Sequence, residues 1–247
     1  MKTSFIAAVA ALLFFSGQAR AFNHLTGEDT LFLGKDNRKI QAGLEYSVAK
    51  GGPDRYSTGA FAILSYGIWH KLDVQVTVPW RGWNSRGISE SGLGDVSLEG
   101  KLQVAHSAAW TYALKPGFSL PAGNEAKSLG AGKGGVWLYG IAGRAGGPWQ
   151  FYLNAGYMLN RNISDEEENI FKGSAAAILE LLPKLHTTAE LEAATSTDKN
   201  SLSHPVYSVF GLVWSPYPTL DLDAGLRLGL TRAADDYALL GGLTLRI

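Results

Sequence analysis

The sequence predicts an all-β protein: a closed antiparallel transmembrane β-barrel of about twelve strands, with short periplasmic turns and long external loops. Three observations predict this fold. Apolar and polar residues alternate at period two along most of the chain, which is typical of strands with one apolar and one polar face. No apolar run after the N-terminus approaches the roughly 20 residues that a membrane helix needs. Short and long connections alternate along the chain between these segments.

The composition excludes several other classes of protein. With 46% apolar and 18% charged residues, the chain is too hydrophobic to be disordered. Its 22 basic and 22 acidic residues balance, which gives no electrostatic reason to expect nucleic acid as a partner. The absence of cysteine excludes thiolate zinc sites, disulfides and a thiol nucleophile.

The N-terminus has the features of a signal peptide. Lys2 supplies the positive charge, an apolar stretch too short to span a membrane follows, and Ala19-Arg20-Ala21 has the small-x-small spacing of a cleavage site. We therefore expect residues 1–21 to be a signal peptide, residues 22–39 a periplasmic N-terminal segment, and residues 40–247 the barrel. A buried N-terminal helix is the alternative.

The strand pattern is clearest in residues 72–80, where every even position is apolar and Asp73, Gln75 and Thr77 lie between them. Later segments repeat this alternation up to the C-terminus. An even number of strands is what a closed antiparallel barrel requires. The alternating segments begin near Ile40, Gly59, Leu72, Gly94, Trp110, Val136, Trp149, Phe171, Leu185, Val206, Leu220 and Tyr237.

The connections indicate how the barrel is oriented. Short periplasmic turns and long external loops are the asymmetry of outer-membrane barrels, and this places both termini in the periplasm. The tight turns lie around His70, Ser107, Gly146, Pro183 and Pro216. The long connections are residues 50–58, 81–93, 121–135, 160–170, 195–205 and 231–236.

The cost of burying charge decides which face meets lipid. An unpaired charge costs several kcal/mol in hydrocarbon and little in a watery lumen, so the apolar faces are expected to point outward. A soluble sandwich or lipocalin-like barrel also alternates, but its polar face is richer in Lys and Glu than the Gly, Ser, Thr and Asn mixture found here. The outward faces carry aromatic residues near strand ends, as membrane-interface girdles do: Tyr46, Tyr66, Trp80, Trp110, Trp149, Tyr157, Trp214 and Tyr237.

The opposite faces are then expected to line the lumen. Their acids outnumber their bases, so an open channel is expected to favour cations. Small inward residues such as Gly117 and Gly156 are expected to widen the lumen locally. The expected lumen-lining residues are Glu45, Phe61, Ile63, Asp73, Gln75, Asp95, Glu99, Lys101, Lys115, Tyr152, Lys172, Glu180, His186, Glu190, Glu192, Asp221, Asp223, Arg227 and Arg246.

Three other motifs have features of a binding or catalytic site. Residues 130–135 formally match the dinucleotide-binding fingerprint, but a strand follows where that motif needs a helix, which favours a flexible external loop. The acidic run at residues 165–168 is predicted to be a solvated loop tip, with a cation site as the alternative. His186 shares a face with Glu190 and Glu192, but no Ser or Thr is tied to it by local spacing as a nucleophile.

Several segments resemble the family labelled MetA-pathway of phenol degradation. They are residues 66–80, 92–101, 114–123 and 129–132, and the resemblance extends over residues 33–247. Ala122 departs from the pattern where Thr is expected. The resemblance implies an outer-membrane barrel encoded near aromatic-degradation genes, with transport of small molecules as its role.

The pattern and the resemblance together predict an outer-membrane channel that passes small solutes, including aromatic or partly apolar ones, by diffusion. We expect no catalysis, cofactor, metal or nucleic acid; the expected partners are outer-membrane lipid and a small-molecule solute. The alternatives are a structural or assembly barrel with a closed lumen, and a barrel hydrolase that uses His186. The sequence leaves open the oligomeric state and whether residues 22–39 plug the barrel.

Overall fold

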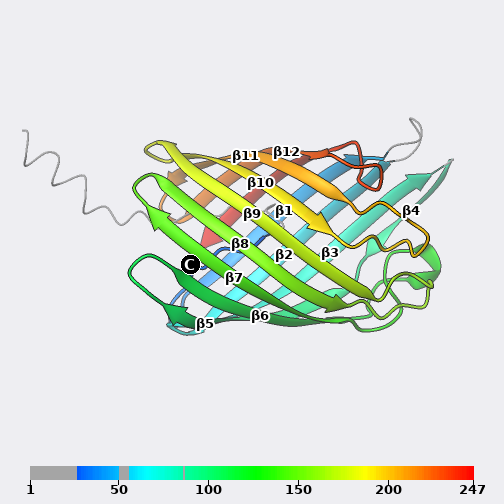
Figure 1. The fold of residues 1–247 in the computed structure, drawn as a ribbon, viewed down its shortest axis with the longest axis horizontal. Helices are drawn as coiled ribbons and strands as arrows, with labels where there is room; N and C mark the ends of the chain where they lie inside the picture. Colours follow the sequence, from blue (N-terminus) through cyan, green and yellow to red (C-terminus); the bar gives the residue numbers. More distant parts are fainter. Residues whose placement is uncertain (1–26, 50–55, 86) are drawn as a thin grey trace, which may run out of the picture.

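The strands form one antiparallel sheet that closes on itself as a barrel (Figure 1). The computed structural model describes residues 27–49, 56–85 and 87–247, so the expected signal peptide and cleavage site lie outside the described residues. The strands are β1 (Arg38–Val48), β2 (Tyr56–Trp69), β3 (Leu72–Ser85), β4 (Ile88–Leu93), β5 (Val96–His106), β6 (Thr111–Leu120), β7 (Val136–Gly146), β8 (Trp149–Leu159), β9 (Asn169–Leu182), β10 (Leu185–Ala194), β11 (Val206–Tyr217), β12 (Leu220–Gly229) and β13 (Tyr237–Arg246). The first and last strands close the barrel, with Gly43 opposite Gly242.

Strands β4 and β5 share one position in the barrel. The first half of β3 pairs with β5, and its second half, from Trp80 onward, pairs with β4. In the described part of the chain the barrel therefore has twelve strand positions, as the sequence predicted. The expectation of a loop over residues 81–93 was wrong, because β3 and β4 form a hairpin there. Outside the membrane both faces of a hairpin meet water, so no apolar alternation marks it in the sequence.

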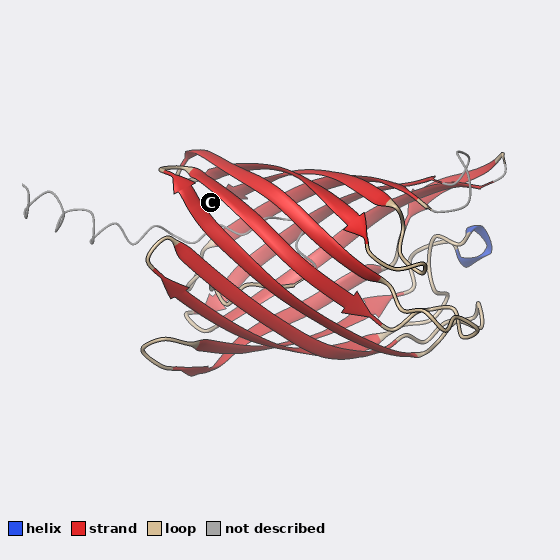
Figure 2. Cartoon of the chain, turned by 45° about the horizontal axis from the view of Figure 1, so that its top comes forward, coloured by secondary structure: helices blue, strands red, loops and turns tan. Residues whose placement is uncertain are grey.

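The connections have the predicted asymmetry. Figure 2 shows tight turns at the end of the barrel where the C-terminus lies and longer loops at the opposite end. The described residues include one short 3-10 helix, η1 (Glu125–Lys127), in the loop between β6 and β7. Among the described residues, no helix is long and apolar enough to cross a membrane.

The outer surface is apolar and ringed by aromatic side chains. Leu44, Leu64 and Leu212 are at least half exposed at mid-strand positions. The aromatic residues expected at strand ends are exposed as well, except Trp110, which is half-buried. At the long-loop end the Tyr46 ring lies 5.8 Å from that of Tyr56. This surface fits a hydrocarbon layer bounded by two interfaces.

The loop after β6 is tied to the barrel wall. The Asp95 carboxylate accepts hydrogen bonds from the backbone N–H groups of Gly123 (3.0 Å) and Ala131 (2.8 Å). Leu129, between them, is only 2% exposed. No helix follows residues 130–135, because β7 begins at Val136, which argues against dinucleotide binding. The loop that was expected to be flexible is therefore held in place by two hydrogen bonds to the Asp95 carboxylate and by the buried Leu129 side chain.

The acidic loop tip bonds to a neighbouring loop. Lys199 donates a hydrogen bond to Asp165, and this bond lowers the pKa of the Asp165 carboxyl below its ordinary value. The backbone N–H of Glu167 donates to the carbonyl of Thr197 in the same neighbouring loop. Over the described ranges, no group of three or more His, Cys, Asp or Glu side chains is placed to hold a metal ion.

Candidate functional site: the barrel lumen and the segment that crosses it

The N-terminal segment enters the lumen and bonds to several walls of the barrel. Its backbone N–H groups donate to inward side chains on β10, β8 and β3, and the Asn154 amide also donates to the Glu28 carbonyl (3.1 Å). Residues 27–33, part of the expected periplasmic segment over residues 22–39, therefore lie inside the barrel, which answers for these residues the question of plugging that the sequence left open. The backbone bonds are Gly27 N to Glu190 Oε1 (2.8 Å), Glu28 N to Asn154 Oδ1 (3.0 Å) and Leu33 N to Asp73 Oδ2 (3.0 Å).

Two ion pairs reinforce this arrangement. Lys115 Nζ lies 2.5 Å from Glu28 Oε1, and Lys101 Nζ lies 2.9 Å from Asp29 Oδ1. The two lysine side chains are at most 9% exposed, so each ammonium needs an anionic partner to offset its lost hydration. The segment thus provides two carboxylates that compensate cations of the barrel wall.

Glycines in the wall make room for the segment. A Cβ atom at Gly67 would lie within 3.0 Å of the Gly34 carbonyl, and one at Gly143 would lie within 3.0 Å of the Thr30 side chain. These positions do not widen an open lumen, because the N-terminal segment fills the space beside them.

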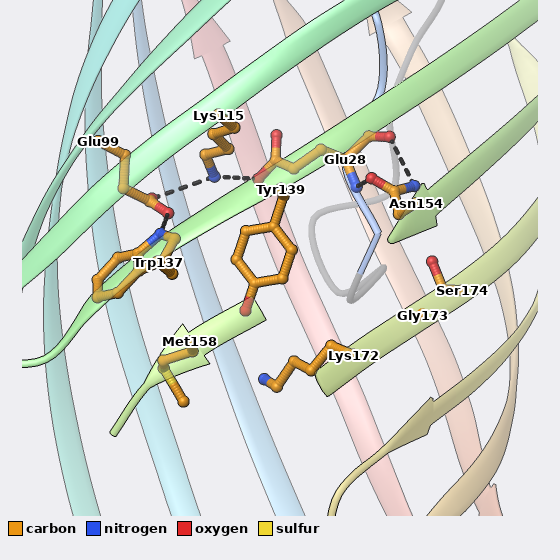
Figure 3. A pocket seen from close by; sticks show the side chains of 10 residues that line it. All are labelled: Glu28, Glu99, Lys115, Trp137, Tyr139, Asn154, Met158, Lys172, Gly173 and Ser174. Carbon is orange, nitrogen blue, oxygen red and sulfur yellow. Dashed lines mark hydrogen bonds and ion pairs between the residues drawn. The ribbon is translucent and has the colours of Figure 1, made fainter. Parts of the chain in front are cut away.

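The segment separates two cavities in the lumen. Consecutive residues face different cavities, Glu28 the one toward the long loops and Asp29 the one toward the short turns. The cavity toward the short turns has a volume of about 430 Å³, and its wall includes Phe32 and Arg246. The cavity toward the long loops, here named the outer cavity, has a volume of about 270 Å³ (Figure 3). It is lined by Glu28, Glu99, Lys115, Trp137, Tyr139, Asn154, Met158, Lys172, Gly173 and Ser174.

Two aromatic side chains give the outer cavity an apolar wall. The Trp137 ring lies over Gly117 and the Tyr139 ring lies over Gly156, since a Cβ on either glycine would come within 3.0 Å of the ring. Gly117 and Gly156 therefore do not widen the lumen as expected. Sequence reasoning missed both aromatic residues because residues 136–139 form an unbroken apolar run, in which alternation cannot show which side chains point inward.

Most of the expected lumen charges do point inward, where they are buried or half-buried. Glu45 pairs with Arg227 at 2.5 Å, and Asp221 pairs with Arg246 and accepts a hydrogen bond from Ser215. Glu180 departs from the expectation, because its side chain is exposed beside a short turn. The remaining expected lumen-lining residues lie on the barrel wall, line one of the two cavities, or bond to the loop after β6. They are Phe61, Ile63, Asp73, Gln75, Asp95, Glu99, Lys101, Lys115, Tyr152, Lys172, His186, Glu190, Glu192 and Asp223.

The barrel-hydrolase alternative needs a hydroxyl nucleophile hydrogen-bonded to His186. The hydroxyl nearest along the same strand face is that of Thr188, and its Oγ1 is buried with no hydrogen-bond partner among the described residues. A serine- or threonine-type nucleophile needs a base within hydrogen-bond reach. His186 is thus not placed to activate this hydroxyl.

Residues 31–247 match the family model described as Putative MetA-pathway of phenol degradation. The chain belongs to this family. The resemblance that the sequence motifs indicated is thereby confirmed over nearly the whole predicted barrel. No curated protein sequence matches the chain significantly.

Several solved structures share the fold of this chain at low sequence identity. The COG4313 outer membrane channel from Pseudomonas putida F1 has a TM-score of 0.71 at 14% identity, covering 91% of this chain and 100% of that one. The KdgM porin has a TM-score of 0.53 at 11% identity, covering 84% and 98%. The translocator domain of autotransporter NalP from Neisseria meningitidis has a TM-score of 0.51 at 11% identity, covering 100% and 98%. The fold and the apolar belt are those of an outer-membrane β-barrel.

Proposed function

We propose that this protein is an outer-membrane channel that passes small solutes, including aromatic or partly apolar ones, by diffusion. The observation that carries the proposal is the pair of cavities on either side of the N-terminal segment, which give the lumen space at both ends. The similarity of the fold to the channel from Pseudomonas putida F1 supports it.

The dimensions of the cavities set the size of the solute. Cavities of about 270 and 430 Å³ accommodate a single small molecule and exclude a folded protein. Between the cavities, residues 27–33 narrow the path. Hydrogen bonds and ion pairs hold them to the barrel wall. Movement of this segment would then control how easily a solute passes.

A structural or assembly barrel with a closed lumen is the second candidate. The ion pairs that fix Glu28 and Asp29 favour it, because they hold the N-terminal segment across the lumen. A closed barrel would conduct no ions, whereas a channel would, so conductance separates the two functions.

Planar-bilayer recording with the purified full-length protein tests the proposal. We expect discrete conductance steps, together with uptake of labelled benzoate into protein-containing liposomes. The same preparation should fractionate with outer membranes and change its electrophoretic mobility on boiling, because a closed barrel has no free edge and unfolds slowly in detergent. Absence of conductance and uptake, in protein that shows the mobility change, would contradict the channel function and favour the structural barrel.

A further inference from the structure

The outer cavity contains a lysine without an ionic partner. Lys172, on β9, forms no ion pair with any residue in the described ranges. In Figure 3 its ammonium group points into the cavity toward Tyr139 and Met158, and no dashed line reaches it. An ammonium group in a wall that is mostly shielded from water gains from an anion placed beside it.

The other charged groups of the cavity already have partners. Glu99 accepts hydrogen bonds from Gln75 (2.5 Å) and Trp137 (3.0 Å) and pairs with Lys115 at 3.1 Å. Glu28 pairs with the same lysine. The carboxylates that line the cavity are therefore compensated, and Lys172 is the cation left to attract a ligand.

The groups around Lys172 suit a flat apolar body with one acidic end. Tyr139 and Met158 flank the open space on one side, and the Ser174 hydroxyl is buried without a hydrogen-bond partner in the described part of the chain. The ring of Tyr139 is fixed flat against the wall because Gly156 beneath it has no Cβ. A fixed ring and a polarisable thioether are good contacts for an aromatic ring.

We propose that the outer cavity binds a single-ring aromatic carboxylate, with its carboxylate on Lys172 and its ring against Tyr139 and Met158. A volume of about 270 Å³ is large enough for one aromatic ring with a short substituent. The inference rests on the proposed channel function for its biological role, because it places a recognition site on the outer side of the N-terminal segment. The binding itself does not require an open channel.

Glu192 is the internal competitor for Lys172. It lies on β10, in register opposite Ser174, and its Oε2 is buried without a hydrogen-bond partner among the described residues. Its carboxylate lies close enough to act electrostatically on the Lys172 ammonium group, so ligand binding has to compete with it. Replacement of Glu192 by Gln is therefore expected to strengthen binding of an anionic ligand.

Titration calorimetry with benzoate as the probe, on the full chain in detergent micelles, tests the site. We expect Lys172→Met, which keeps the aliphatic stem, to raise the Kd for benzoate at least about tenfold, equal to about 1.4 kcal/mol. Lys133→Met, at an exposed loop lysine, is the matched control and should leave the Kd unchanged. Gly156→Ala should also weaken binding, because its Cβ displaces the Tyr139 ring.

Ligand analogues test the same site in the unmodified protein. Benzyl alcohol lacks the charge and acetate lacks the ring, so both should bind at least about tenfold more weakly than benzoate. Equal binding of benzoate and either analogue, no binding of benzoate, or an unchanged Kd in Lys172→Met would overturn the inference. Benzoate binding that depends on Lys172, in a protein without conductance, would support the site and contradict only the channel function.

Discussion

Lys115 and Glu28 lie 87 residues apart in the sequence and meet inside the lumen, with Lys115 Nζ 2.5 Å from Glu28 Oε1. The same ammonium group contacts Glu99 on β5 at 3.1 Å. One lysine of β6 thus joins the crossing segment to a second strand of the wall. Together with the Lys101–Asp29 pair, this contact holds the N-terminal segment in the lumen.

Neutralising the two acids of the segment should open the lumen. In Glu28→Gln with Asp29→Asn we expect a severalfold larger single-channel conductance, because the segment loses both ion pairs. Breaking the buried Lys101–Asp29 pair should cost about 3–5 kcal/mol, and the Lys115–Glu28 pair less, since the Glu28 side chain is 34% exposed. Planar-bilayer recording measures the change.

The control for this experiment is the loop variant Glu166→Gln with Glu168→Gln, which removes the same number of charges from exposed positions outside the lumen. It should conduct like the unmodified protein. Equal conductance of the segment variant and this control would mean that the ion pairs do not determine the width of the path.

Gly67 should be sensitive to a single methyl group. In Gly67→Ala the new Cβ would lie within 3.0 Å of the Gly34 backbone carbonyl, so the segment or the strand has to shift. We expect a loss of about 1–3 kcal/mol, typical of overpacking. Gly146→Ala is the matched control, because nothing lies within 4 Å of its added Cβ. Urea unfolding in lipid vesicles compares them, and equal stability of the two variants would contradict the close approach at Gly67.

Sequence alone predicted the strands well because lipid imposes a strict rule. Every membrane-embedded strand needs an apolar outer face, and the resulting alternation located the start of β3 and both ends of β12 almost to the residue. The hairpin of β3 with β4 lies beyond this constraint, and the sequence indicated a loop there.

The site was harder to predict because its parts come from distant segments. Alternation placed Glu99 and Lys115 inward but could not show that Glu28 enters the lumen to pair with Lys115. It also could not show that the rings of Trp137 and Tyr139 fill the space above wall glycines, since that depends on cross-strand register. A local sequence pattern shows whether a side chain points into the lumen or toward lipid, whereas the side chain it meets is determined by the closed barrel.

Two neighbouring positions on β3 should differ in the stability that a lysine substitution costs. Val76→Lys places a charge on the outward face, where mid-membrane positions cost about 2–4 kcal/mol. Gln75→Lys points into the lumen toward the Glu99 carboxylate, which Gln75 already contacts at 2.5 Å, and should cost little. The fraction of folded protein after refolding into vesicles, measured by the mobility change on boiling, reports the difference. Similar losses of folded protein for both variants would show that the outward and inward faces of β3 are assigned wrongly.

The inward charges of the described lumen remain predominantly acidic once the structure is considered. Asp221 is fully buried and paired with Arg246, so it contributes to stability more than to the field in the path. The acids are Glu28, Asp29, Glu45, Asp73, Asp95, Glu99, Glu190, Glu192, Asp221 and Asp223, and the bases are Lys39, Arg81, Lys101, Lys115, Lys172, Arg227 and Arg246.

Ion selectivity should therefore favour cations modestly, and two substitutions should shift it in opposite directions. Glu192→Gln removes an acid and is expected to weaken the preference, whereas Lys172→Met removes a base and is expected to strengthen it. Both shifts should grow at 0.01 M salt, where the Debye length is about 30 Å. Reversal potentials across a salt gradient measure them. A preference for anions in the unmodified protein, or shifts of the same sign in both variants, would mean that these side chains do not face the conducting path.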